Sequence, residues 1–423
     1  MKRAAAALCA FGAAWSCGTA LAAEFEFHPS LGLSEEYSDN ILETSTGRKS
    51  DFVTRVLPGA SLLYRSGSLS ADARYTFEYR HFAKGWKEDE EVHTLALGGH
   101  AALFENFLFV DVSDSLSRRS LDVTRDTTTE SLFSDQTDEN RATVSPYLLW
   151  RLAEKITLKT GYRYTDVRYW EASGATESSG STSAIDRREH RGYADLTHEL
   201  TARLSLNASY SYGSVNTDIA DYTEHNVSGG ARFEYADKCF VYGSIGNSWQ
   251  DFDNGRDASN FFWNAGVTHD FVVFTGTLEG LVRYSDDPLT VSTKETRYSA
   301  TLEKRMDSGT MGFSVVRSEF DAEETLSLAA ESDRKVTAIN LFTRQELSSR
   351  LAVALALTGD KVTRDEGTGY PYHFSGSASV TYSFPYEIST ALTYTHTEYR
   401  YEIEESAGGR QTNRVILDVR KVF

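Results

Sequence analysis

Charged side chains recur along this chain at every second position, between aromatic or aliphatic ones. Tyr75, Phe77 and Tyr79, for example, alternate with residues that are mostly charged. Charges in such a row can filter solutes if they line a water-filled passage, or they can pair across neighbouring strands and brace a wall. The two roles are compatible. The residues for which a pore-lining role is predicted are Arg74, Glu78, Arg80, Lys159, Arg163, Arg232, Glu234, Glu279, Arg283, Arg297 and Arg414.

The ten histidines give weaker chemical signals. The sequence has no H-E-x-x-H motif and no paired metal spacing. His190 and His198 are eight residues apart on one poorly alternating segment, and ordinary packing explains them better than metal ligation. His81, His225 and His396 have Ser and Asp residues nearby, as in barrel hydrolases that use a Ser–His pair or a His with acidic residues. Ser and Asp are abundant in all the loops, so this proximity has little weight. We therefore expect no enzyme activity, no metal and no cofactor.

The segments that carry these residues have a period of two, which is the period of a β-strand. Leu69–Tyr79 and Leu204–Tyr212 are clear examples, and the alternation continues to Phe423. There are about 20 such segments of roughly 9–12 residues, the length needed to cross a tilted bilayer. Glu189–Glu199 and Lys335–Phe342 alternate poorly, which leaves 18 strands as an alternative.

Short and long connections follow one another along the chain. The short ones include Arg65–Ser68, Glu105–Asn106, Ala153–Lys155, Asp237–Lys238, Asp307–Gly309 and Pro385–Tyr386. The long polar ones include Asn40–Ser50, Ala83–Glu90, Arg118–Glu139, Glu171–Asp186, Asp251–Asn260, Asp321–Asp333, Asp360–Gly369 and Arg400–Arg410. Short periplasmic turns and longer extracellular loops indicate an up-and-down outer-membrane barrel.

Two of these loops have features of their own. Arg118–Glu139 is the longest and is a candidate for an inward-folded constriction. The acidic stretch Lys87–Glu91 is expected to be solvated on the outside, as is Asp321–Glu324, where divalent cations bridge lipopolysaccharide.

Aromatic residues gather where the two surfaces of a bilayer would lie, because their rings suit lipid and their polar tips suit headgroups. Beside short turns stand Trp150, Phe240, Tyr242, Phe271, Phe274, Phe384 and Tyr386. Beside long loops stand Tyr79, Phe82, Tyr164, Tyr169, Trp249, Phe261, Tyr284 and Tyr399. Two aromatic girdles are therefore expected.

The N-terminus has the pattern of an export signal. Lys2 and Arg3 precede an apolar stretch too short to span a bilayer, and Ala20-Leu21-Ala22 fits a cleavage site. Residues 1–22 are therefore expected to be a signal peptide and residues 23–423 a single barrel domain. The formal net charge of −18 argues against nucleic acid as a partner.

The last strand, RVILDVRKVF, alternates and ends on Phe423. This pattern resembles the C-terminal targeting signal of bacterial outer-membrane barrels. It predicts recognition by the barrel-assembly machinery and a location in the Gram-negative outer membrane, among lipid and lipopolysaccharide.

YSDN from Tyr37 and KSDFVTRVLPGASL from Lys49 resemble the N-terminal pattern of outer-membrane β-barrel porins. The most similar group is the outer-membrane barrel family associated with PEP-CTERM/exosortase systems. The resemblance covers about 30 residues and implies a link to exopolysaccharide synthesis and polysaccharide-export components. YSDN could supply oxygen ligands to calcium, but Asp39 and Asn40 are better explained as ending the first strand through side-chain-to-backbone bonds.

The sequence thus predicts an all-β, transmembrane, up-and-down antiparallel barrel without a plug domain. TonB-dependent transporters are disfavoured, because strands begin within a few residues of the expected cleavage site. A barrel of this size leaves a water-filled lumen unless a loop blocks it. The favoured function is a porin-like pore for saccharides or an exopolysaccharide. The alternative is a structural or assembly partner of an envelope polysaccharide-export or protein-sorting system, its lumen closed by loops, and a barrel hydrolase comes third.

Overall fold

The computed structural model describes residues 23–104, 106–120, 136–171, 184–255, 257–287, 290–322, 334–364, 371–401 and 409–423. Within these ranges no helix has the length and apolarity needed to cross a membrane. The strands are β1 (Glu24–Ser38), β2 (Asp51–Arg65), β3 (Leu69–Phe82), β4 (Glu90–Leu103), β5 (Leu108–Ser120), β6 (Gln136–Ala153), β7 (Ile156–Glu171), β8 (Arg187–Glu199), β9 (Leu204–Thr217), β10 (Tyr222–Ala236), β11 (Cys239–Phe252), β12 (Asp257–Asp270), β13 (Thr275–Asp287), β14 (Thr290–Met306), β15 (Gly309–Ala322), β16 (Arg334–Glu346), β17 (Leu351–Arg364), β18 (Tyr372–Ser383), β19 (Ile388–Arg400) and β20 (Arg410–Val422).

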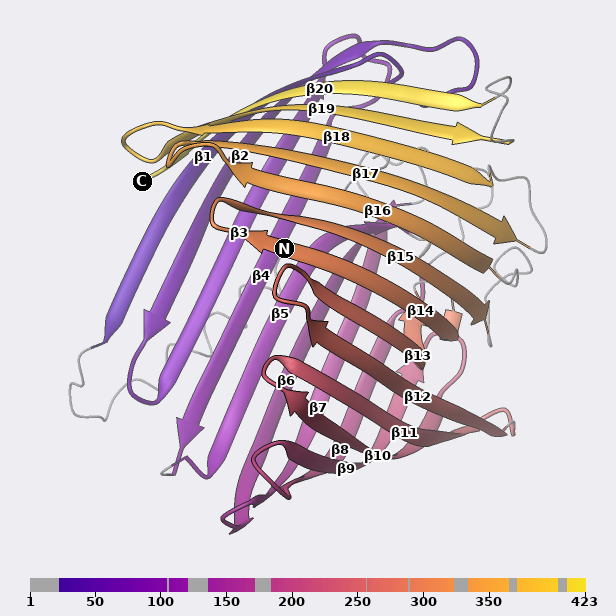
Figure 1. Cartoon of the computed structure of the whole chain (residues 1–423). Coiled ribbons are helices and arrows are strands. Elements are labelled where there is room, and N and C mark those ends of the chain that lie inside the picture. Colours follow the sequence, from indigo (N-terminus) through magenta and orange to yellow (C-terminus); the bar gives the residue numbers. More distant parts are fainter. Residues whose placement is uncertain are drawn as a thin grey trace, which may run out of the picture.

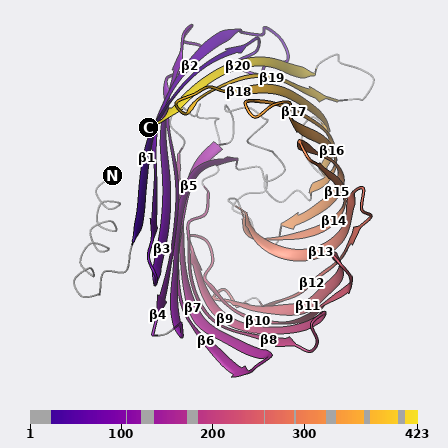
Figure 2. The ribbon, with the colours of Figure 1, turned by 60° about the vertical axis from the view of Figure 1, so that its left-hand side comes forward.

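Each strand pairs antiparallel with its neighbours in sequence, and β1 also pairs with β20, so the sheet closes into a barrel (Figure 1, Figure 2). The closing register runs from Ser30↔Val422 to Ser38↔Arg414. The two poorly alternating segments form β8 and β16, which pair fully with their neighbours. The barrel therefore has 20 strands, as predicted, and the alternative of 18 is wrong.

The strands are longer than predicted and range from 12 residues in β18 to 18 in β6. Their extra length lies at the end of the barrel that carries the loops 39–50, 83–89 and 121–135, which is called the loop end here. Backbone pairing needs no apolar side chain, so it continues where the alternation fades. The predicted loop Asp251–Asn260 is accordingly mostly strand, and its connection shrinks to 253–256.

One face of the strands carries the exposed large apolar side chains and points away from the barrel interior. On β1, Leu31 and Leu33 belong to this outer face, while the alternating Ser34 and Glu36 are buried on the inner face. Contiguous apolar surface of this extent marks contact with lipid or protein. The predicted alternation thus becomes an apolar outside and a polar inside.

The aromatic girdles are only partly as predicted. Trp150, Phe271, Phe384 and Tyr386 are exposed near the turn end, the end opposite the loops, and Trp249 and Phe261 are exposed towards the loop end. However, Phe82, Tyr169, Phe240, Tyr242 and Tyr399 have the parity of the inner face. Phe82 pairs with the buried Val53, for example, and the Tyr169 hydroxyl donates to Glu139, which is also buried. The prediction assigned these residues to a girdle because they are close to a turn or loop in the sequence. Their alternation along the strand shows that their side chains face the barrel interior instead.

The YSDN segment closes the seam between β1 and β20. Asp39 accepts hydrogen bonds from the Asn413 backbone N–H at 2.7 Å and from its Nδ2 at 2.6 Å. Asn40, with no exposed surface, donates from Nδ2 to the carbonyl oxygens of Gln411 (2.9 Å) and Thr44 (2.8 Å). The structural interpretation of this motif, as a strand-ending pair of side chains, is therefore confirmed.

Candidate functional site in the barrel interior

The barrel interior near the loop end holds a continuous set of buried and partly buried ion pairs, which we call the ionic tier. It spans β1 to β6. Its members are Glu36, Arg55, Glu78, Arg80, Lys87, Glu90, Arg118 and Asp138.

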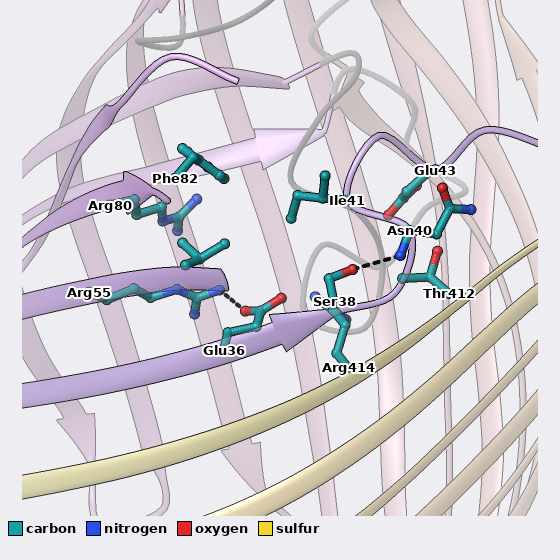
Figure 3. A pocket seen from close by; sticks show the side chains of 11 residues that line it. Glu36, Ser38, Asn40, Ile41, Glu43, Arg55, Arg80, Phe82, Thr412 and Arg414 are labelled. Carbon is teal, nitrogen blue, oxygen red and sulfur yellow. Dashed lines mark hydrogen bonds and ion pairs between the residues drawn. The ribbon is translucent and has the colours of Figure 1, made fainter. Parts of the chain in front are cut away.

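The first half of the ionic tier crosses β1, β2 and β3. Arg55 pairs with Glu36, and its Nε lies 3.5 Å from Glu78. Arg80 Nε donates to Glu78 at 2.6 Å. Figure 3 shows Glu36, Arg55 and Arg80 around a pocket of about 20 Å³, which is room for about one water molecule. These contacts brace the wall in the way that cross-strand ion pairs were expected to.

Glu90 is the hub of the second half. Only 1 % of its surface is exposed, and its carboxylate contacts Arg80 at 3.1 Å, Arg118 at 3.5 Å and also Lys87. Burial lowers the pKa of Lys87, which lies in the connection between β3 and β4. The prediction that the stretch Lys87–Glu91 is solvated is therefore wrong for Lys87 and Glu90, because both side chains turn inward and pair.

The hairpin of β5 and β6 leaves the wall near the loop end. Pairing between β4 and β5 stops at Leu95↔Leu116, whereas pairing between β5 and β6 continues to Ser120↔Gln136. The purple ends of β5 and β6 lie inside the ring of strands in Figure 2. Arg118 there reaches both Glu90 and, at 2.9 Å, Asp138. Residues 121–135 of the predicted constriction lie outside the described residues, but the strand ends that carry them point inward.

The hairpin of β13 and β14 departs in a similar way. Pairing between β12 and β13 stops at Trp263↔Val282, while pairing between β13 and β14 continues to Asp287↔Thr290. In Figure 2 the salmon-coloured end of this hairpin also lies within the ring. Two hairpins therefore narrow the loop end.

All eleven residues predicted to line a pore have the parity of the inner face, opposite the exposed apolar side chains. Glu78 and Arg80 belong to the ionic tier. Arg283 pairs with Glu295 at 2.6 Å, and Glu279 accepts a hydrogen bond from Tyr242 at 2.6 Å. No carboxylate among the described residues lies within 4.0 Å of the cations of Arg74, Lys159, Arg163, Arg232 and Arg297. That solutes pass these side chains stays a prediction.

Sequence reasoning missed a row of rings on the inner wall of β4 to β8, which we call the aromatic column: His100, Phe109, Tyr147 and Tyr193. His100 stacks on Phe109 with 5.6 Å between ring centroids, and Phe109 stacks on Tyr147 with 5.1 Å. The Lys159 ammonium lies 3.8 Å from the centroid of the Tyr147 ring. Parity could have placed each ring inside, but only the register brings the rings together.

Gly161 makes room for Tyr193 in this column. A Cβ at Gly161 would stand 2.5 Å from the Tyr193 hydroxyl and 2.8 Å from the Tyr147 Cβ. We expect Gly161→Ala to displace Tyr193 and to lower the free energy of unfolding by about 1–3 kcal/mol, as overpacking does. Urea unfolding of the refolded barrel measures this change. Gly192→Ala is the matched control, because nothing lies within 4 Å of its added Cβ. Equal effects of the two substitutions would contradict the packing described here.

Asp89, in the connection between β3 and β4, gives a pH-dependent prediction. The Tyr79 hydroxyl, which donates to Asp89 at 2.5 Å, and then His81 lower the pKa of this carboxyl group. A carboxyl group whose pKa is lower in the folded state stabilises the protein at a pH above its unfolded-state pKa. This stabilisation is lost as the pH falls through the folded-state pKa. Asp89→Asn should therefore cost at most about 1 kcal/mol at pH 7, since the group is exposed, and nothing at a pH below both values. Thermal unfolding midpoints of both proteins between pH 7 and pH 2 test this. A difference that persists at the lowest pH would exclude the ionised carboxylate as its cause.

Solved structures share this architecture at very low sequence identity. The FrpB iron transporter from Neisseria meningitidis superposes with a TM-score of 0.55 and 8 % identity over 94 % of this chain and 81 % of that one. A mutant of the ferric enterobactin receptor PfeA from Pseudomonas aeruginosa gives 0.54 and 9 % over 94 % and 80 %, respectively. The siderophore receptor PirA from Acinetobacter baumannii gives 0.54 and 8 % over 94 % and 80 %.

No family model and no curated protein matches the sequence of this chain. The likeness therefore concerns the fold. The resembling barrels belong to TonB-dependent receptors, the class that the sequence disfavoured on the ground of an expected missing plug. This chain has the fold of an outer-membrane β-barrel, closed by 20 antiparallel strands.

Proposed function

We propose that this chain is an outer-membrane channel through which hydrophilic solutes, saccharides among them, cross passively. The observation that carries the proposal is the division of the wall into an apolar outside and an inside with cations that no carboxylate of the described residues neutralises. Charges such as those of Lys159 and Arg163 are tolerated at membrane depth where water hydrates them. A barrel of 20 strands is also wider than its own side chains fill. The resembling structures are named as receptors and a transporter, which is consistent with transport.

The chain would reach the outer membrane by export and barrel assembly. Residues 1–22 direct export, and the barrel-assembly machinery recognises the strand that ends at Phe423. Lipid and lipopolysaccharide then surround the apolar outer face. Polysaccharide-export components are the partners that the resemblance of the YSDN segment implies, and they would make an exopolysaccharide one of the solutes.

A second candidate is a structural or assembly partner in the envelope whose lumen is closed. The observation that favours it is the ionic tier, together with the two hairpins that lean inward at the loop end. In this role the barrel would contact other envelope proteins and pass no solute.

Single-channel conductance in planar bilayers separates the two functions. The mature protein is compared with a variant in which residues 121–135 are replaced by Asn-Gly, a sequence that suits a two-residue hairpin turn. Steady openings of the mature protein, or openings that appear only in the variant, support an open or a gated channel. Silence of both refolded barrels would overturn the channel and leave the closed partner.

A further inference from the structure

We infer that the aromatic column, with Lys159 and Arg163, forms a binding site for an elongated saccharide that carries carboxylates. The two cations hold the carboxylates, and the hydroxyl groups of the column bind the sugar. The inference rests on the proposed channel function, because it names the class of solute that the channel binds.

The site is built around Tyr193 on β8. Its ring lies across Gly161 of β7, with Lys159 and Arg163 on either side of that glycine in the strand. The Lys159 ammonium is 5.7 Å and the Arg163 guanidinium 5.3 Å from the centroid of the Tyr193 ring. The Tyr193 hydroxyl is 3.2 Å from the buried Ser145 hydroxyl, which fixes the ring. The two cations thus have defined positions along an aromatic ring.

These cations have no acidic partner in the described part of the chain. Asp195 is opposite Lys159 in the register of β7 and β8, but it forms no ion pair with it. The Asp111 carboxylate contacts His100 instead, with 2.7 Å between Oδ1 and the histidine Nδ1. A cation is stabilised less by contact with a ring face than by a carboxylate, because a charge-assisted hydrogen bond is stronger than a cation–π contact. The pair is therefore ready to bind an anionic group of a ligand.

The surface that the column presents is polar. Phe109 and Tyr147 stack nearly parallel, with 15° between their planes, and Lys159 covers a face of Tyr147. The faces of Phe109 and Tyr147 are thus covered by His100, by each other and by Lys159, which leaves the Tyr147 hydroxyl group and the two cations for contact with a ligand. The stacked rings of Phe109 and Tyr147 offer an aliphatic chain no free face, whereas the hydroxyl groups of a sugar find donors and acceptors.

The spacing of the two cations favours an elongated ligand. Lys159 and Arg163 are four residues apart on one strand, which places their Cα atoms about 13 Å apart. The two charged groups lie beside the same ring, 5.7 and 5.3 Å from the centroid of Tyr193. A chain of uronic acid residues carries carboxylates at intervals and can contact both cations at once, which raises its affinity through the effective concentration of the second group.

Isothermal titration of trigalacturonate into the refolded mature protein in detergent tests the site directly, and current block in planar bilayers tests it in the channel. We expect Lys159→Gln and Arg163→Gln each to weaken trigalacturonate binding about tenfold. Arg344→Gln is the matched control, because Arg344 has inner-face parity on β16 and lies outside the column. The affinity of the Arg344→Gln variant for trigalacturonate should equal that of the unmodified protein. Maltotriose, a neutral oligomer of the same length, should bind at least tenfold more weakly than trigalacturonate.

Equal binding of maltotriose, or unchanged binding in Lys159→Gln and Arg163→Gln, would overturn the site. Inorganic phosphate that binds as tightly as trigalacturonate would show a small-anion site and would overturn it as well. The failure of the channel is a separate result, since a barrel that binds trigalacturonate in detergent but never conducts keeps the site and loses the channel. A barrel that conducts without binding or block keeps the channel and loses the site.

Discussion

Replacing Glu90 by glutamine is expected to lower the free energy of unfolding by about 3–5 kcal/mol, the effect of removing one partner from a buried ion pair. Glu90 is the carboxylate shared by Arg80, Arg118 and Lys87. Arg80 keeps Glu78, and Arg118 keeps Asp138, but the buried ammonium of Lys87 loses the carboxylate beside it. Urea unfolding followed by tryptophan fluorescence measures the change.

The pH dependence of this variant gives a second measurement. Burial already lowers the pKa of Lys87, and removal of the Glu90 charge should lower it further. The unfolded chain then binds more protons than the folded one, so the stability of Glu90→Gln should rise as the pH increases through the folded-state value towards the unfolded value.

Glu303→Gln is the control for Glu90→Gln. It removes the same kind of charge from an ion pair with Arg305 at 2.8 Å, and the Arg305 side chain is 85 % exposed. Its expected cost is below about 1 kcal/mol. If the two variants unfold at the same urea concentration, the ionic tier does not stabilise the barrel as described.

Asn40→Ala is expected to weaken the closing seam, with a loss of about 2–4 kcal/mol, because carbonyl and amide groups of the backbone lose their partners in a buried place. Besides its two donated bonds, Asn40 Oδ1 accepts a hydrogen bond from the Thr44 backbone N–H at 3.2 Å. Hydrogen exchange should accelerate first at the loop-end amides of β1 and β20, and unfolding should follow at lower denaturant concentration.

Asn216→Ala is the comparison for the seam. Asn216, an exposed residue at the end of β9, donates to Asp221 in the following connection at 3.0 Å, so its loss should change the stability by less than about 0.5 kcal/mol. Acceleration of exchange throughout the barrel in Asn40→Ala, without any preference for β1 and β20, would argue against a local role of the YSDN segment.

The sequence predicted the class of fold and the number of strands because a single period of two, repeated along the chain, determines which side chains lie outside the barrel and which lie inside. It also placed Lys159 and Arg163 on the inner face. It did not predict that Glu90 and Lys87 are buried, because Glu90 is contacted by Arg118 from a hairpin that has left the wall, and Lys87 in turn pairs with Glu90. Departure of a hairpin is a property of the register between β4 and β5, and the alternation within one strand contains no information about it.

The aromatic column was missed for a related reason. Tyr147 and Tyr193 belong to strands on either side of β7, and both come close to Gly161 between them because that residue has no side chain. A glycine within a strand indicates close approach of a neighbour but does not say which ring fills the space. The alternation within a strand gives the direction of each side chain. Which side chains lie next to one another across β6, β7 and β8 follows only from the register of these three strands.

The two hairpins that lean inward also determine the shape of the entrance. Those of β5–β6 and β13–β14 leave the wall at separate places of the ring, so the loop end is narrowed from two sides (Figure 2). If the barrel conducts as proposed, a passage narrowed from two sides would select molecules by their smallest cross-section rather than by their mass. On the proposed function we therefore expect a linear, flexible polymer to pass more readily than a compact globule of equal mass.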